Sequence, residues 1–335
     1  METLSWGGVI TRIFLQLSPV WIALIATFWV SIVYKRKLGL YGKLFDSTVG
    51  MIGFGIVMFW VFAALFSNVF GWLMPNEPQF FEVSMKHALP GEALSDGSGH
   101  YLLGGDKQAR DVFSRMIYGS GIVIMIAPLA TLMAFMVGIT LGLPAGYFGG
   151  KLDTILSFLA NLILAFPVIL LFYLLVTKEI VATGLPQYMA AILFLFPLIF
   201  LTVLFNSRYY TDPGKRNPIL IALWVIGGWI YLSFISQNGG DSAITILPAA
   251  LDAFNPDPNI LVVFVSVVFV NSPTVFRIVR GLTLDIKSRD YVAAGQTRGE
   301  GPWYIMLWEI LPNVRGPLIV DFCLRIGYAT ILLGT

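Results

Sequence analysis

Charged residues are scarce in this sequence. They make up 12% of its 335 residues, against roughly 25% in an average soluble domain, while 57% are hydrophobic and the mean hydropathy is +0.80. Only one cysteine and two histidines are present. A single cysteine excludes an internal disulfide, and Cys323 lies in an apolar stretch where a small, buried and unreactive side chain is expected. The composition therefore predicts an integral membrane protein and indicates no metal site.

Several signatures of catalysis are also missing. The sequence has no glycine-rich loop ending in Lys-Ser or Lys-Thr, no Gly-x-Ser-x-Gly turn and no His-Glu-x-x-His pair. The formal net charge of +2 gives no reason to expect nucleic acid as a partner. The sequence therefore predicts a chain that is not an enzyme.

Long apolar runs are what the sequence does contain. A run of about 20 apolar residues can cross the hydrocarbon core as a helix, which satisfies its own backbone hydrogen bonds in lipid. The runs cover residues 14–34, 49–71, 118–145, 154–176, 187–206, 218–236, 259–280 and 316–335. Lys35-Arg36-Lys37 follows the first run, which therefore has the basic flank of a membrane span rather than the cleavage site of a signal peptide. We expect an all-α, polytopic helical membrane protein.

The charges between the runs predict its orientation. Loops 35–48 and 207–217 hold more Lys and Arg than Asp and Glu, so both are expected inside the cell. Loops 72–117 and 237–258 hold more acids than bases and are expected outside. Segment 281–315 then falls inside by parity, and the amino terminus falls outside.

The outer loop ends in a stretch, 100–117, that allows two interpretations. Apolar residues recur there near helical spacing, with charged residues between them: Val112, Phe113, Met116 and Ile117. This pattern suits a short interfacial helix that leads into the next span. It suits equally a solvated loop that only starts the span helix.

The polar segment 281–315 has residues that are typical of the ends of two short helices. Gly299 suits the positive φ of a helix C-cap, and Pro302 suits the first turn of the next helix. Apolar residues then recur at helical spacing until Leu311-Pro312, where we expect the run to end. The segment is therefore predicted to be a helical hairpin.

This hairpin could meet either a protein or a membrane surface. Ala293, Ala294 and Gly295 give its first helix a small face that another surface can approach closely. Three charged residues nearby could fix the register of such a contact: Arg289, Arg298 and Glu300. A hairpin lying on lipid head groups fits the same pattern, and the residues alone leave both interpretations open.

The segment resembles the EAA loop of ABC-importer permeases, in which Glu-Ala-Ala is followed after three residues by Gly and closed by Leu-Pro. The matching positions are Ala294, Gly299, Leu311, Pro312 and Asn313, with Tyr291-Val292 ahead of them. Ala293 stands where the family usually has Glu, and Gly295 where it usually has Ala. With Ala293 in that place, docking is expected to depend on shape and on neighbouring charges.

Three upstream segments carry the same resemblance. They are Tyr101-Leu102-Leu103-Gly104-Gly105-Asp106 with the residues up to Gly119, the stretch from Gly142 to Gly150, and Leu164-Ala165-Phe166-Pro167. Together they are similar to the second permease subunit of the dipeptide, oligopeptide and nickel import branch. The similarity covers about 45–176 and 259–335.

The chain departs from that family pattern in three places. It has an additional span at 14–34, it has two spans within 177–258 where the family has a short outside connection, and it stops at Thr335 where the family continues into a final span. We therefore expect an extra span with a basic loop (1–48), a first family span with its outer segment (49–117), and a permease core (118–335). The core would contain the 177–258 insert and a coupling loop at 281–315, and would be truncated before the final span.

The resemblance implies a type I ABC importer transmembrane domain with additional spans, working by alternating access in a bacterial inner membrane. It implies a second permease subunit, two cytoplasmic ATPase subunits or domains, and a periplasmic substrate-binding protein. No cofactor would be bound by this chain, and ATP and magnesium would act at the ATPase. Eight residues would couple to that ATPase: Tyr291, Ala293, Ala294, Gly295, Gly299, Leu311, Pro312 and Asn313.

The solute and the class of transporter stay open at this point. Within the branch, peptides or peptide-like solutes are expected, with nickel, opines and peptide antibiotics as alternatives. Outside it, a proton-coupled secondary transporter and a membrane scaffold that anchors a soluble enzyme remain rivals. The role of the insert 177–258 is not indicated by its sequence.

The spans contain two candidate residues for the transport pathway and two candidate hinges. Asp321 and Arg325 are four residues apart in an apolar run, so they share a helix face and should point to the interior, either lining a pathway or fixing helix packing. Pro167 and Pro273 are candidate hinges, since proline frees a backbone carbonyl and kinks a helix. A static kink is the alternative for each.

Overall fold

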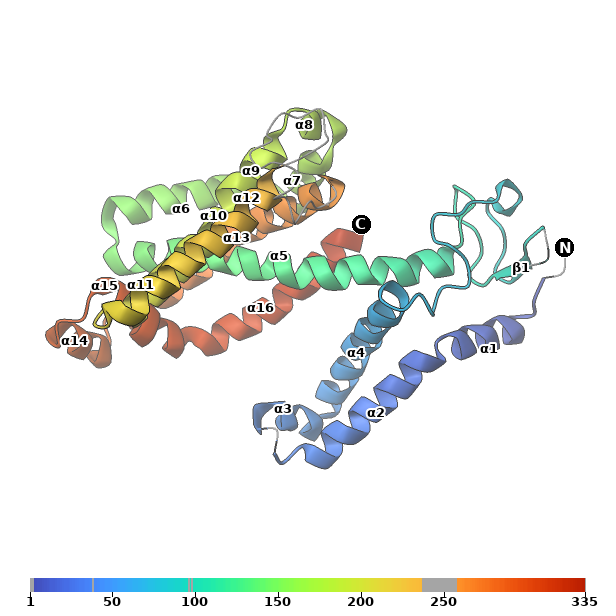
Figure 1. The fold of residues 1–335 in the computed structure, drawn as a ribbon, viewed down its shortest axis with the longest axis horizontal. Helices are drawn as coiled ribbons and strands as arrows, with labels where there is room; N and C mark the ends of the chain where they lie inside the picture. The colour runs from blue at the N-terminus through green and yellow to red at the C-terminus, as the bar shows by residue number, and fades with distance from the viewer. Residues whose placement is uncertain (1–2, 38, 96, 98, 237–257, 335) are drawn as a thin grey trace. The chain divides into compact units, whose positions relative to one another are not determined.

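The computed structural model describes residues 3–334 except 38, 96, 98 and 237–257. The chain divides into two compact units, Met1–Met125 and Ile126–Thr335. In the described part, strand is confined to one two-stranded sheet and the remaining regular structure is helical (Figure 1). The expectation of an all-α membrane protein is confirmed.

The first unit contains two long apolar helices. Helices α1 (Trp6–Gln16) and α2 (Ser18–Tyr34) meet at a bend of 57°. Helix α3 (Gly39–Lys43) and the 3-10 turn η1 (Leu44–Asp46) then lead to α4 (Thr48–Asn68). Aromatic rings join α2 to α4, with neighbouring centroids 5.1 to 5.9 Å apart: Phe28, Tyr41, Phe45 and Phe54.

Residues 69–95, 97 and 99–111 of this unit fold into a small cap. It contains the 3-10 turn η2 (Val83–Met85) and the antiparallel strands β1 (Glu92–Ala93) and β2 (His100–Tyr101). The Tyr101 side chain is fully buried, and its hydroxyl donates to the Ala109 carbonyl at 3.2 Å. The stretch before the third span is therefore folded rather than a solvated loop, although its residues from Val112 onward start the span helix, as the second interpretation of 100–117 expects.

Helix α5 (Val112–Phe148) begins directly at the end of the cap and runs for 37 residues. The buried Asp111 carboxylate starts it, accepting hydrogen bonds from the Phe113 N–H at 3.1 Å and from the Ser114 hydroxyl at 2.7 Å. The expected separate interfacial helix at 100–117 is wrong. The apolar positions from Val112 onward are in phase with the span that follows, so one continuous helix satisfies them all.

The second unit holds the end of α5 and the remaining helices. These are α6 (Gly150–Leu164), α7 (Val168–Val176), α8 (Lys178–Ala182), α9 (Leu185–Leu193), α10 (Leu195–Arg208), α11 (Pro213–Ala222), the π-helical turn η3 (Leu223–Gly227), α12 (Gly228–Ile235), α13 (Pro258–Ile286), α14 (Asp290–Thr297), α15 (Pro302–Tyr304), the π-helical turn η5 (Ile305–Ile310) and α16 (Leu311–Gly334). The expected acidic loop 237–258 lies outside the described residues, apart from Pro258.

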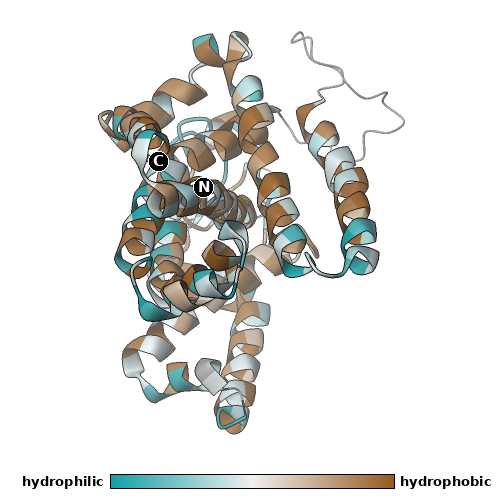
Figure 2. Cartoon of the chain, turned by 90° about the vertical axis from the view of Figure 1, so that its left-hand side faces the viewer, coloured by the Kyte–Doolittle hydropathy of each residue, from teal (hydrophilic) through white to brown (hydrophobic). Residues whose placement is uncertain are grey.

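The number of helices that could cross a membrane agrees with the eight runs. Six of the described helices are long and apolar enough to do so, and counting the bent pairs α1–α2 and α6–α7 as spans raises the number to as many as 8. Figure 2 shows apolar residues around these helices and hydrophilic residues gathered toward their ends. This distribution is typical of helices that meet lipid or other apolar helices.

Helix α13 is the centre of the second unit. In its most apolar window 67% of the residues are buried, against 11% for the α11–α12 span. Glycines at every fourth position of α5, Gly138, Gly142 and Gly146, lie against α13. A Cβ at Gly142 would come within 2.9 Å of the Val279 Cβ and 3.0 Å of the Phe276 carbonyl. Their small size therefore sets the close approach of α5 and α13.

Candidate functional site

The polar segment 281–315 folds into a hairpin whose first arm is α14. The Gly299 backbone has a φ of +80° just past the end of this helix. The Gly299 N–H donates to the Gln296 carbonyl, and the Glu300 N–H to the Gly295 carbonyl, at 3.0 and 3.2 Å. These two bonds form a Schellman cap, which depends on a residue that adopts positive φ without strain. The prediction that Gly299 ends the first helix is confirmed.

The second arm consists of α15 and η5, and it does not end where we expected. Pro302 begins it, with Gly301 as N-cap, but the helix then continues through Leu311 and Pro312 into α16. The expected end at Leu311-Pro312 is wrong. A proline ring normally clashes with the carbonyl four residues earlier, here that of Trp308, and the wider π-helical turn at Ile305–Ile310 lies where that clash would arise. The second arm is therefore one end of a membrane-sized helix.

The two arms pack against each other through a small apolar core. Val292 from the first arm and Met306 and Ile310 from the second are fully buried in it. Gly295 faces the second arm, because a Cβ there would lie 3.6 Å from Ile305. The expected small outer face thus comprises Ala293 and Ala294, which are exposed, and excludes Gly295.

A charged pair closes the open side of the hairpin. The Arg298 guanidinium donates to the Glu309 carboxylate, with 2.6 Å between Nη2 and Oε1. The sequence led us to expect Arg298 to face a partner, and the structure instead shows it bound within the chain. Because its side chain is still 54% exposed, this ion pair adds orientation rather than much stability.

The hairpin is fastened to the membrane helices by polar contacts that the sequence analysis missed. Lys287 Nζ donates to the Gly146 carbonyl at 3.0 Å, and Gln296 Nε2 donates to the Tyr147 hydroxyl at 3.1 Å. Earlier in the chain, Arg280 of α13 binds both carboxylate oxygens of Asp153 of α6, with 2.6 Å between Nη2 and Oδ2. Arg280 is the last residue of the run 259–280 and Asp153 directly precedes the run 154–176, so both could have been singled out as charges at the ends of spans.

The predicted coupling residues divide into two groups. The exposed ones are Ala293, Ala294, Gly299, Pro312 and Asn313, while Gly295 is buried and Tyr291 and Leu311 are half-buried. Asn313 also donates to the Glu309 carbonyl at 2.6 Å, across the π-helical turn. The first group is available to a partner, and the second holds the hairpin together.

The structure joins the two pathway candidates to each other and to a cavity. Arg325 Nε donates to Asp321 Oδ2 at 2.7 Å, and Arg325 Nη1 lies 3.5 Å from Asn271 Oδ1 on α13. A cavity of about 330 Å³ between α7, α13 and α16 is lined by Arg325, Asn271 and Tyr328, among mostly apolar side chains. Arg325 is thus a nearly buried cation with one side on a cavity.

The two hinge candidates behave differently. Pro167 lies between α6 and α7, which form an angle of 81°. Pro273 lies inside α13, and the helix continues on both sides of it. The hydroxyl of Ser272 and the amide of Asn271 bind carbonyls one turn back, at Val268 and Val267, with 2.6 and 2.9 Å between the atoms. Pro167 therefore marks a break between two helices, and Pro273 lies in a helix that continues through it.

Within the described residues, no three His, Cys, Asp or Glu side chains gather in a way that would hold a metal ion. Cys323 is exposed and has a free thiol, where a buried side chain was expected.

The fold and the site together define a class: a multi-span helical membrane protein whose polar hairpin is built directly on two of its spans, α13 and α16.

Comparisons with known proteins narrow this class. The family model described as "Binding-protein-dependent transport system inner membrane component" matches residues 218–333. The dipeptide transport system permease protein DppC of Haemophilus influenzae is 26% identical over 247 residues, 74% of this chain and 58% of the relative. DppC of Bacillus subtilis is 26% identical over 245 residues, 73% of this chain and 52% of the relative. The oligopeptide permease protein OppC of Bacillus subtilis is 22% identical over 301 residues, 89% and 70% of the two chains.

Residues 218–333 are thus similar to the inner membrane components of binding-protein-dependent transport systems. The relatives confirm the resemblance to the dipeptide and oligopeptide permease branch. The chain spans about half the length of the first relatives, 58% of one and 52% of another.

Proposed function

We propose that this chain is a permease subunit of an ATP-driven importer for peptides or peptide-like solutes in a bacterial inner membrane. The observation that carries the proposal is the hairpin: a capped first arm, packed on a second arm that continues without a break into α16. A surface that pushes the exposed first arm therefore acts directly on a membrane-sized helix. The names of the relatives, which are dipeptide and oligopeptide transport permeases, support the solute class.

The partners follow from the same proposal. A cytoplasmic ATPase would receive the exposed residues Ala293, Ala294 and Gly299 in a groove and would bind the ATP and magnesium itself. A second permease subunit would complete the pathway, and an outer binding protein would deliver the solute. Alternating access would result from the ATPases moving the hairpins and the hairpins moving α13 and α16.

The predicted orientation is consistent with this arrangement. The charges of loop 207–217 and segment 281–315 assign both to the inside, and Arg208 and Trp308 from these two segments are in contact. The basic ends of α10 and of the hairpin therefore lie on one side of the second unit, where a cytoplasmic partner would meet both.

A substitution at Gly299 tests the proposal. A Cβ at Gly299 or at Gly301 would meet nothing within 4 Å, but only Gly299 has positive φ. Forcing a branched residue into the left-handed region costs about 1 to 2 kcal/mol, so Gly299→Leu should distort the hairpin and lower solute-stimulated ATP hydrolysis by roughly tenfold. The measurement is hydrolysis by the complete importer, purified with its ATPase and reconstituted with its binding protein.

Matched variants and rival outcomes complete this experiment. Gly301→Leu adds the same bulk at a φ of −68° and should hydrolyse ATP like the wild type. Gly299→Asn should lower ATP hydrolysis less than Gly299→Leu does. No ATPase in the purified complex, with uptake abolished by an uncoupler, would instead favour a proton-coupled transporter. Association with a soluble enzyme and no uptake would favour a scaffold.

A further inference from the structure

Helices α9, α10 and α12 lie in the segment 177–258, which we predict from the sequence to be an insertion, and the end of α10 contacts the second arm of the hairpin at Trp308. The Trp308 indole N–H donates to the Ser207 hydroxyl oxygen at 3.1 Å, and the Arg208 guanidinium lies over the indole ring, 4.6 Å from its centroid. Ser207 is buried and donates its own hydrogen to the Leu204 carbonyl at 2.9 Å. Since an indole only donates and a hydroxyl has one proton, this chain of hydrogen bonds has a single direction and every member is satisfied.

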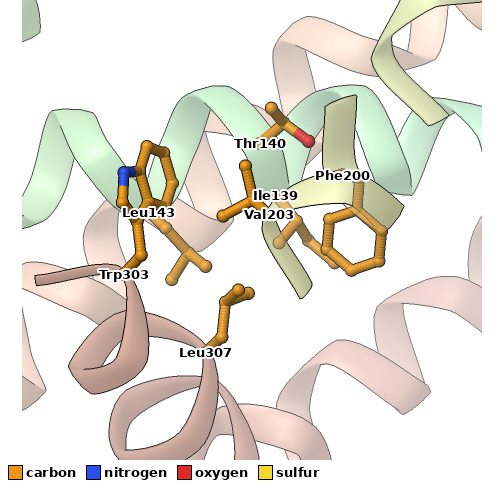
Figure 3. A pocket seen from close by; sticks show the side chains of 7 residues that line it. All are labelled: Ile139, Thr140, Leu143, Phe200, Val203, Trp303 and Leu307. Carbon is orange, nitrogen blue, oxygen red and sulfur yellow. The ribbon is translucent and has the colours of Figure 1, made fainter. Parts of the chain in front are cut away.

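An apolar contact lies beside these polar ones. Figure 3 shows Phe200 and Val203 of α10 facing Trp303 and Leu307 of the second arm, around a small pocket that α5 completes with Ile139, Thr140 and Leu143. Phe200, Val203 and Ser207 follow the spacing i, i+3, i+7, so they form one face of α10. This whole face of the inserted helix is therefore turned toward the second arm.

The other end of the inserted helices is tied to the core of the unit. The Phe194 ring packs edge-on against Phe264 of α13, with centroids 5.7 Å apart. Gln187 of α9 donates to the Ile235 carbonyl at 3.0 Å, and the Tyr231 hydroxyl donates to the Ala191 carbonyl at 2.7 Å. The insert thus bridges α13 and the second arm, the two parts of the chain that the hairpin also joins.

We propose that Ser207, Arg208 and Trp308 form a clasp through which the inserted helices position the second arm, so that the inserted helices follow any displacement of the hairpin. This inference rests on the proposed function, because the displacement would come from the ATPase. A packed interior transmits strain and does not deform gradually, so helices held on one face by both polar and apolar contacts move together. Ser207 and Arg208 are positioning residues in this account, acting on a partner through Trp308.

A double-mutant cycle on the reconstituted importer tests the clasp. Ser207→Ala removes the acceptor, and Trp308→Phe keeps an aromatic ring but removes the donor. Each should raise the ATP hydrolysed per solute imported by roughly two- to tenfold, the range that loss of one hydrogen bond gives, while the ATPase still copurifies. The double variant should be no worse than either single one. Ser207→Thr, which keeps the hydroxyl, should retain the wild-type ratio.

Exposed Asn206 provides the matched control, since it neighbours the clasp residue Ser207 in sequence, and Asn206→Ala should leave the ratio unchanged. A wild-type ratio in Ser207→Ala and Trp308→Phe, or losses that add in the double variant, would overturn the clasp. These results differ from a failure of the proposed function, in which the wild-type chain itself would show no ATP-dependent uptake.

Hydrogen exchange on the purified full chain tests the positioning without any ATPase. Backbone exchange in Pro302–Ile310 should rise to the same extent in Ser207→Ala, Trp308→Phe and the double variant, and should stay at the wild-type level in Ser207→Thr and Asn206→Ala. Unchanged exchange in the first three variants would show that the insert does not hold the second arm.

Discussion

Asp106 organises the turn of the cap that precedes α5. Its carboxylate accepts the backbone N–H groups of Gln108 and Arg110 at 2.7 and 3.0 Å, and the Arg110 side chain at 2.9 Å. Burial acts to raise the pKa of Asp106, but the hydrogen bonds from Arg110 and Gln108 outweigh it and hold this pKa below its ordinary value. Burial, with nearby carboxylates, raises the pKa of Tyr101, whose hydroxyl remains a donor to the backbone.

The stability of the cap should therefore depend on pH through Asp106. A carboxylate whose pKa is depressed by folding contributes stability that is fully present above its unfolded pKa, about 3.9, and is lost as the pH falls through the folded pKa. Asp106→Asn should lower the stability of the cap at neutral pH. The difference in stability between this variant and the wild type should become smaller as the pH falls below about 4. Hydrogen exchange in residues 100–111 measures both effects.

A control for this prediction is Asp46→Asn. Asp46 forms an ion pair with Lys35 at 3.1 Å, but the two side chains are 64% and 39% exposed, so its loss should change little. If the wild type and Asp106→Asn differ by the same amount at pH 7 and at pH 3, the role given to Asp106 in the cap is incorrect.

At the scale of elements, the contact of α5 with α13 depends on glycine. A Cβ at Gly142 would meet the Val279 Cβ and the Phe276 backbone, which cannot move aside as the end of a flexible side chain can. Helix pairs of this kind in membranes associate through the close packing that small residues allow. The hairpin depends on this contact too, because Lys287 reaches the carbonyl of Gly146 on α5.

Gly142→Ala should therefore destabilise the chain although alanine is the better helix former. Overpacking typically costs about 1 to 3 kcal/mol, more than the roughly 1 kcal/mol that alanine gains over glycine in a helix. Gly281→Ala on α13 is the matched control, since a Cβ there meets nothing within 4 Å and should be neutral or stabilising. Thermal unfolding in detergent compares the two, and equal melting temperatures would contradict the packing argument.

The helices and their contacts also show how much of the fold and of the candidate site can be predicted from the sequence. Apolar run length predicted the spans, and Gly299 predicted the end of α14, because both depend on local properties of the chain. The passage of the helix through Pro312 was missed, since it depends on a π-helical turn that no residue type specifies. The Arg280–Asp153 pair and the Ser207–Trp308 bond join residues 127 and 101 positions apart, and only the packing of the helices brings such residues together.

At the scale of the whole molecule, the second unit connects the hairpin at one end to the Arg325 cavity along the same helices. Helix α16 carries the second arm at its start and Arg325 further along, and α13 carries Asn271 before it leads to α14. We propose that Arg325 receives the carboxylate of a peptide in this cavity, because a nearly buried arginine on a mostly apolar surface is suited to binding an anion. The alternative is that the Asp321–Arg325 pair only fixes helix packing.

Replacing both charges together separates these two roles. Removing Arg325 alone would leave Asp321 as an unpaired charge in the membrane, whereas the double variant Asp321→Asn, Arg325→Met is neutral and similar in shape. If the pair only packs helices, the double variant should import peptides like the wild type.

If Arg325 binds a carboxylate, uptake by the double variant of peptides with a free carboxyl terminus should fall by about tenfold or more, the effect of losing a charge-assisted hydrogen bond. Uptake of the same peptides with an amidated carboxyl terminus should not fall. A double variant that imports both peptides at the wild-type rate would remove Arg325 from the pathway.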